Sequence, residues 1–163
     1  RADHRATGGV SAPRTARGER SWGLTTQLYG IRSSENWGIG DFTDLAHLTE
    51  SAAARGAATV GLNPIHALFA AEPRHFSPYS PSSRSWLDYL YIDVKRVAGF
   101  QYDAATQALA RPEAVFAVQE AELVDYAALA AIKRPILEAL YRRFADREIN
   151  TGSASAESFS KFC

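Results

Sequence analysis

The sequence contains no methionine and a single cysteine among its 163 residues. Because Cys163, the last residue, is the only cysteine, no disulfide can form within the chain, which favours a reducing, cytoplasmic location. The lack of methionine even at position 1, and an ending that falls inside an expected helix, predict an incomplete chain. No apolar run approaches the roughly 18 residues of a membrane helix, so we expect no membrane partner.

The chain also lacks an excess of either charge, with 18 basic and 18 acidic residues. No long-range field therefore favours nucleic acid or an anionic membrane. Residues 1–20 are rich in Arg, Ala and Gly and hold one larger apolar residue, Val10, so they cannot bury a face. We expect a disordered, solvated linker there; binding of a polyanion by its arginines is the less favoured alternative.

The first ordered part of the chain has the pattern of a strand, a helix and a second strand. Residues 22–29 are β-prone, and residues 58–62 form a short apolar run typical of a buried parallel strand. Between them, Asp41 is a good N-cap for a helix that runs to Arg55, and Gly56 supplies the stop. This order predicts a βαβ unit.

The remainder is predicted to hold one more strand-like piece, at residues 90–94, and then helices. Asp103 can cap a short helix that ends near Pro112, and Asp125 can cap a longer one. Pro135 lies inside the longer helix and predicts a break or kink. The apolar face of that helix consists of Leu129, Ile132, Ile136, Leu137, Leu140 and Phe144.

The most informative stretch follows the second strand, over residues 61–84. It is polar, stiffened by prolines, and holds one aromatic ring, Tyr79, between Pro78 and Ser80-Pro81. Proline fixes the backbone, so this ring has little freedom, which suits stacking on a sugar face. A connecting loop with Tyr79 packed inward explains the composition equally well. Hydroxyls that suit a hydroxyl-rich ligand come from Ser77, Ser80, Ser82 and Ser83. The three tryptophans, Trp22, Trp37 and Trp86, could also stack on a sugar, although each is more often a core residue.

Two patterns that suggest cofactors are weak. Gly38 and Gly40 lie between strand and helix, as in a dinucleotide fingerprint, but the third glycine position holds Thr43. His66 and His75 flank the polar loop without a nearby cysteine or pair of acids, which makes a poor metal site. We therefore expect no metal and no cofactor, and we expect His66 to form a hydrogen bond in the loop or to face a ligand.

The acids nearest the loop are Asp88 and Asp93. A glycosidase needs two carboxyl groups roughly 5 to 9.5 Å apart across a sugar ring, and sequence spacing cannot establish such a pair. We expect both acids to be structural, either capping turns or pairing with Arg84 or Lys95.

Six motifs follow one another along the chain: Trp22-Gly-Leu-Thr-Thr-Gln-Leu-Tyr29, Arg32-Ser33, Asn36-Trp-Gly-Ile-Gly-Asp-Phe42, Gly61-Leu-Asn-Pro-Ile-His-Ala-Leu-Phe69, Ser77-Pro-Tyr-Ser-Pro-Ser-Ser-Arg84 and Tyr91-Ile-Asp-Val94. In this order they resemble the 4-α-glucanotransferase family, also called amylomaltase, disproportionating enzyme or glycoside hydrolase family 77. The resemblance is close over residues 21–100 and looser in the helical part.

The resemblance implies an α/β fold: part of a TIM (β/α)8 barrel, beginning with its first βαβ unit, plus a helical insertion. The domains would be a linker at 1–20, the βαβ unit with its substrate loop at 21–100 and a helical subdomain at 101–163. Asn63 and His66 would lie at the C-terminal face of the barrel, where active sites are built. In this family the tyrosine of the Ser-Pro-Tyr motif stacks on the sugar at the cleavage subsite, and the neighbouring serine contacts the glucan. These roles pass to Tyr79 and Ser77.

The resemblance also implies transfer of α-1,4-glucan segments from a maltooligosaccharide donor to an acceptor by retaining double displacement. In the family the nucleophile and the acid/base lie on later strands, so we expect no catalytic residue in this chain and no activity of the chain alone. The alternative hypothesis is a non-catalytic α-glucan-binding fragment.

Overall fold

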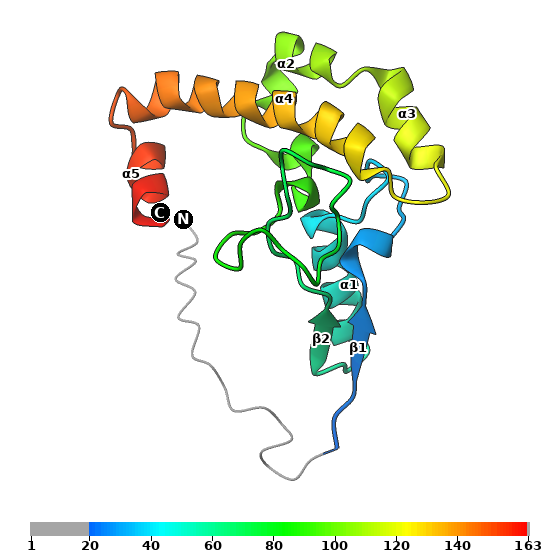
Figure 1. Ribbon diagram of the computed structural model, residues 1–163. Coiled ribbons are helices and arrows are strands. Elements are labelled where there is room, and N and C mark those ends of the chain that lie inside the picture. The colour runs from blue at the N-terminus through cyan, green and yellow to red at the C-terminus, as the bar shows by residue number, and fades with distance from the viewer. Residues whose placement is uncertain (1–19, 163) are drawn as a thin grey trace.

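The computed structural model describes residues 20–162; residues 1–19 of the expected linker, and Cys163, lie outside the described part. Figure 1 shows a long helix, α4, across one end of the molecule and a small sheet at the other. Within residues 20–162, no helix is both long and apolar enough to cross a membrane. The strands are β1 (Gly23–Thr26) and β2 (Thr59–Leu62), and the helices are α1 (Phe42–Ala54), α2 (Ala104–Leu109), α3 (Pro112–Glu120), α4 (Tyr126–Phe144) and α5 (Ala154–Phe162). Short helical turns are η2 (Leu28–Gly30), η3 (Tyr89–Tyr91), η4 (Val94–Arg96), η5 (Phe100–Tyr102) and the π-turn η6 (Ala145–Ile149).

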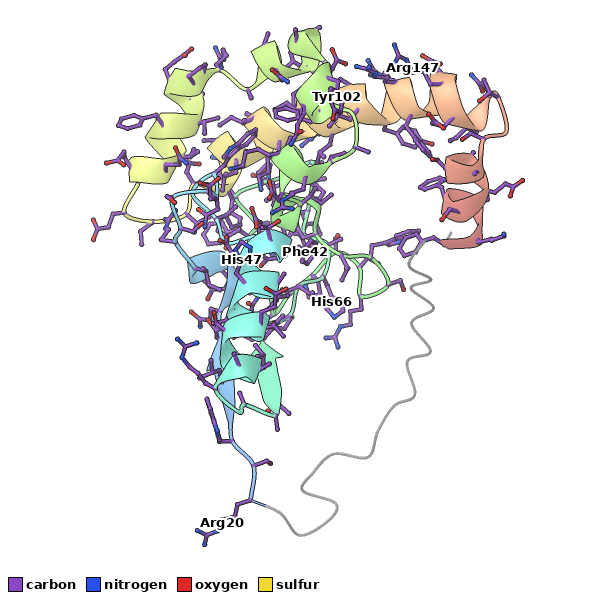
Figure 2. The ribbon with its side chains drawn as sticks, turned by 180° about the vertical axis from the view of Figure 1, so that it is seen from behind. Arg20, Phe42, His47, His66, Tyr102 and Arg147 are labelled. Carbon is purple, nitrogen blue, oxygen red and sulfur yellow. The ribbon has the colours of Figure 1, made fainter. Side chains whose placement is uncertain are left out.

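The predicted βαβ unit is confirmed. β1 and β2 pair in parallel, with Gly23 opposite Thr59 and Thr26 opposite Leu62, and α1 covers one face of the pair (Figures 1 and 2). The first strand is shorter than predicted, because the chain turns into η2 after Thr26. The Leu28 amide there donates to the Asn63 side chain rather than to a neighbouring strand.

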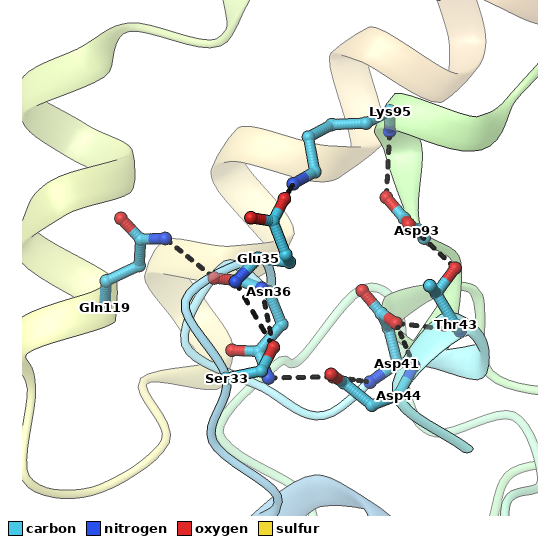
Figure 3. Close-up of polar contacts among 9 residues, drawn as sticks. All are labelled: Ser33, Glu35, Asn36, Asp41, Thr43, Asp44, Asp93, Lys95 and Gln119. Carbon is cyan, nitrogen blue, oxygen red and sulfur yellow. Dashed lines mark hydrogen bonds and ion pairs between the residues drawn. The ribbon is translucent and has the colours of Figure 1, made fainter. Parts of the chain in front are cut away.

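The start of α1 is fixed by the capping residue that the sequence predicts. The Asp41 carboxylate accepts from the amides of Thr43 and Asp44, and the Asp44 carboxylate accepts from the Asp41 amide, which completes a capping box (Figure 3). Asp44 also accepts from the Asn36 side chain at 2.8 Å. The preceding loop is thereby held to the helix.

The predicted strand at residues 90–94 is wrong, since the segment forms the turns η3 and η4 instead. The Asp88 carboxylate accepts from the Leu90 amide, and the Asp93 carboxylate accepts from the Lys95 amide. Each carboxylate thus caps a short turn, and Asp88 binds the Leu90 amide that a strand would have offered to a neighbour.

In the helical part the predicted caps are confirmed, but the predicted break at Pro135 is not. Asp103 and Asp125 cap α2 and α4 as predicted. α4 continues without a break through Pro135, whereas Pro112 begins a helix, α3, that the prediction lacked. Proline is well suited to the first position of a helix, where its missing amide costs nothing.

The core lies between α4, α3, the turns η3 and η4 and the loop before α1. The predicted apolar face of α4 is confirmed for five of its six residues: four are buried, and Leu137 packs at the edge of the core. The sixth, Phe144, lies against Phe159 of α5. The fully buried members elsewhere are Leu28, Ile39 and Val94. The charged side chain of Lys133 is also fully buried.

Candidate functional site

The Tyr79 loop, residues 66–87, follows β2 and closes at its base. His66 and Leu87 pair as an isolated antiparallel bridge. The Ser82 hydroxyl donates to the carbonyl of Ala67 at 3.0 Å. Ser82, one of the hydroxyls that could face a ligand, therefore holds the loop together.

The loop lies against α4. The ring of Phe76 stacks on that of Tyr126, with centroids 4.8 Å apart and 3° between the ring planes. The guanidinium of Arg134 donates to the carbonyl of Ala70. Burial raises the pKa of the Tyr126 hydroxyl. The position of the loop is thus set partly by a helix far along the chain.

Tyr79 lies between two hollows in the surface. One, of about 520 Å³, is lined by Ser77, Tyr79 and Leu123, among others. The other, of about 530 Å³, lies at the C-terminal ends of β1 and β2 and is lined by Thr26, Asn63 and Tyr79, among others. Tyr79 is 65% exposed, so the inward-packed alternative is wrong. An exposed ring between two hollows can stack on the apolar face of a ligand in either one.

Asn63 is buried and joins the ends of the two strands. Its Oδ1 accepts from the Leu28 amide at 2.8 Å, and its Nδ2 donates to the Pro64 carbonyl at 2.6 Å. Nδ2 also lies 3.5 Å from the Tyr91 hydroxyl. Asn63 therefore forms part of the wall of the second hollow while its polar atoms bind the protein.

Of the other predicted site residues, Ser77 lies at a hollow and His66 does not. Ser77 is exposed and lines the first hollow beside Tyr79. His66 lines neither hollow and stays at the base of the loop (Figure 2), and its buried Nδ1 has no hydrogen-bond partner among the described residues. The structure brings Asn63, Ser77 and Tyr79 together and leaves His66 apart.

Asp88 and Asp93 are structural, as predicted. Asp88 is 3% exposed, and its two oxygens accept from the amides of Leu90 and Leu68 at 2.8 and 3.1 Å. Burial raises the pKa of the Asp88 carboxyl. Asp93 accepts from the Thr43 hydroxyl at 2.8 Å (Figure 3). Neither carboxylate is presented to a ligand.

Lys133, on α4, is buried against η3. Its Nζ donates to the carbonyls of Leu90 and Ile92 at 2.6 and 3.0 Å. Burial lowers its pKa to about 8, against the opposing effect of the carboxylates of Asp41, Asp93, Asp44 and Asp88. The cation thus fixes η3 to α4.

The glycine pair before α1 has a packing role. A side chain at Gly38, where φ is +77°, would place its Cβ 2.1 Å from the carbonyl oxygen of Val118. At Gly40 the Cβ would lie 2.1 Å from the carbonyl oxygen of Leu28. Close approach of backbones therefore explains both glycines without a nucleotide.

The three tryptophans lie away from the hollows. Trp37 is a core residue, whereas Trp22 and Trp86 are exposed and line neither hollow. No group of three or more His, Cys, Asp or Glu residues that could hold a metal ion occurs between residues 20 and 162.

Several lining residues were missed by the sequence reasoning. Thr25, Thr26 and Gln27 line the second hollow because β1 ends there, but a strand predicted to reach Tyr29 hid that end. The carboxyl ends of parallel strands lie at the same edge of a sheet. Had the first strand been predicted to end at Thr26, these residues would have been expected beside Asn63. No local sequence pattern predicted the contact between Phe76 and Tyr126.

Comparison with known proteins identifies the family. The model of glycoside hydrolase family 77, described as 4-alpha-glucanotransferase, matches residues 26–163. The chain belongs to this family. The resemblance drawn from the six motifs is therefore confirmed.

Relatives share much of this chain but are far longer. A 4-alpha-glucanotransferase of Haemophilus influenzae is 41% identical over 136 residues, which cover 81% of this chain and 20% of the relative. One of Mycobacterium tuberculosis is 43% identical over 95 residues, or 54% of this chain and 13% of the relative. The crystal structure of amylomaltase from Corynebacterium glutamicum matches with a TM-score of 0.65 at 26% identity, over 78% of this chain and 19% of that one. The chain thus spans a fifth or less of the length of these family members.

Proposed function

We propose that this chain forms one wall of the substrate cleft of a 4-α-glucanotransferase that transfers α-1,4-glucan segments between maltooligosaccharides. The observation that carries the proposal is Tyr79, which is 65% exposed and lines both hollows. Ser77 beside it offers a hydroxyl to the same space. A ring with neighbouring hydroxyls matches a sugar, which has an apolar face and a polar rim.

The reaction would be a retaining double displacement. A carboxylate forms a glucosyl-enzyme intermediate, a carboxylic acid protonates the leaving oxygen, and the hydroxyl of an acceptor glucan takes the place of water. Among the described residues that line the two hollows, Glu122 supplies a single carboxylate. We therefore propose that the reacting pair comes from outside these residues and that this chain binds and orients the glucan.

The β1–α1–β2 unit would be the first βαβ unit of a (β/α)8 barrel, with residues 101–163 as a helical insertion. The second hollow lies at the C-terminal ends of both strands, which is the face that carries the active site in such barrels. The TM-score of 0.65 to an amylomaltase supports this placement.

A chimera tests the proposal. The segment of the Haemophilus influenzae relative that matches this chain would be replaced by the chain, and disproportionation of maltotriose would be followed by the release of glucose and longer maltodextrins. We expect the chimera to be active, and Tyr79→Ala to reduce kcat/KM by roughly tenfold or more, because a stacked aromatic ring contributes about 1–3 kcal/mol. Trp86→Ala is the matched control, since this exposed ring lines neither hollow. Equal losses in the two variants would contradict the proposal.

The chain alone should release no glucose from maltotriose; release would show that it holds its own catalytic carboxylates. The second candidate is a non-catalytic α-glucan-binding role, which the exposed Tyr79 also favours. An upward shift by maltoheptaose of the thermal transition of the chain, lost in Tyr79→Ala, together with an inactive chimera, would support that role instead.

A further inference from the structure

One buried carboxylate ties the base of the Tyr79 loop to the rest of the molecule. Asp88 Oδ2 accepts from the Leu68 amide inside the loop, and Oδ1 accepts from the Leu90 amide in η3. The Asp88 amide donates to the Ile65 carbonyl at 3.0 Å, just before the loop begins. A single residue thus joins the loop, the end of the preceding segment and the turn that follows.

In this chain the clamp uses both oxygens of a carboxylate. A carboxylate accepts with both oxygens, whereas an asparagine of the same shape has one acceptor and one NH₂ donor. In Asp88→Asn, one of the two amides, Leu68 or Leu90, would face a donor. The Leu90 bond is buried and the Leu68 bond partly buried, so facing either amide with a donor would weaken the attachment of the loop.

The turn that Asp88 caps is itself attached to α4. Lys133 Nζ donates to the carbonyls on either side of η3, at Leu90 and Ile92, so the turn that Asp88 caps is fixed to that helix. The far part of the loop reaches the same helix through the stack of Phe76 on Tyr126. In the sequence, Tyr79 lies between these two attachments, at Phe76 and Asp88.

We propose that Asp88 is a positioning residue for Tyr79: its two-oxygen clamp, seated on the turn that Lys133 fixes to α4, holds the Tyr79 loop in place between the two hollows. The identity of the ligand of Tyr79 rests on the function proposed above, whereas the role of Asp88 in holding the loop is independent of that function. Its loss would release the loop while leaving α1 and the sheet intact.

Hydrogen–deuterium exchange of the 163-residue chain tests the clamp without any glucan. For Asp88→Asn we expect roughly tenfold faster exchange in peptides that cover residues 66–87, because a buried hydrogen bond is lost, with unchanged exchange in α1. Asp93→Asn is the matched control: this acid also caps a short turn near Lys133, but it contacts Thr43 and Lys95 instead of the loop. Its loop peptides should exchange at the wild-type rate.

A second variant separates the clamp from folding. In Asp88→Ser the hydroxyl can still cap the Leu90 amide, since serine is a good N-cap, but it cannot also reach Leu68. The loop should again exchange faster while the thermal midpoint stays near that of the wild type. Wild-type loop exchange in both Asp88 variants, or equal acceleration of loop and α1 in Asp88→Ser, would overturn the proposal. Either result would leave the function of Tyr79 standing, because glucan transfer is not measured.

Discussion

At the scale of single residues, the most unusual group is Lys133. It is 1% exposed, it donates to two backbone carbonyls, and four carboxylates influence its charge from α1, η4 and the base of the Tyr79 loop. A cation in such a place is costly to desolvate, and its hydrogen bonds offset only part of that cost. Its protonation should therefore respond strongly to folding.

We predict that the stability of the chain rises with pH above about 8. Folding lowers the pKa of Lys133 from 10.5 to about 8, so between these values the unfolded chain holds a proton that the folded chain has released. Urea unfolding at successive pH values should show the free energy of unfolding rising by at most about 1.4 kcal/mol per pH unit. The series should stop before pH 10, because burial raises the pKa of Tyr91 and Tyr126 and reverses the slope there.

The variant Lys133→Met should abolish this slope. Lys95→Met is the control, since Lys95 is a partly exposed lysine that pairs with Glu35 on the surface, and it should keep the slope. A rise with pH that persists in Lys133→Met would show that another group titrates.

At the scale of elements, the helices obey local rules except at one position. Asp41, Asp103 and Asp125 each cap a helix. The Asp103 carboxylate also pairs with Arg143 at 2.7 Å, which joins α2 to α4 and lowers the pKa of Asp103 to about 2. Pro135 is the exception, because α4 runs through it although proline removes one helix hydrogen bond.

We predict that Pro135→Ala stabilises the chain. Residue 135 is exposed, so the change restores a backbone donor without altering the core. Alanine is about 3 kcal/mol more favourable than proline inside a helix, and the greater freedom of the unfolded chain returns about 1 kcal/mol, which leaves a gain of about 2 kcal/mol. Urea unfolding measures it. Ala131→Pro, one turn earlier on the same exposed side, should do the opposite; a loss of stability in Pro135→Ala would contradict the account.

At the scale of the whole molecule, the sheet within residues 20–162 is small. It has two strands, so one edge of β1 and one edge of β2 are unpaired. Apolar side chains near these strands and at the base of the Tyr79 loop are exposed, with Trp22 at 48%, Trp86 at 72% and Leu87 at 56%. Unpaired edges beside apolar surface favour pairing with another chain.

We therefore predict that the isolated chain self-associates as its concentration rises. Sedimentation velocity at low and high concentration should show the shift. Leu24→Lys in β1 should weaken association, because a charge on an edge strand opposes edge pairing. Leu123→Lys, a more exposed leucine away from the sheet, should have little effect. A monomer at every concentration would contradict the prediction.

Sequence reasoning identified the elements whose causes are local. The βαβ order, the three helix caps and the apolar face of α4 follow from neighbouring residues or from a short period, and the structure confirms them. The prediction of a strand at residues 90–94 failed because its apolar pattern was given more weight than turn capping by Asp88 and Asp93, which the structure shows. The break at Pro135 failed because packing of the α4 face outweighs one lost hydrogen bond.

By itself, the sequence determined the family, through six motifs in order, and the stiff loop that carries Tyr79. Only the tertiary structure decided that Tyr79 is exposed between two hollows, that Asn63 binds the Leu28 amide, and that Lys133 is buried against η3. The physical reason is range. A cap or a helical period acts within about four residues, whereas the Asn63 and Lys133 contacts join residues 35 and 43 positions apart, whose meeting depends on how the whole chain packs.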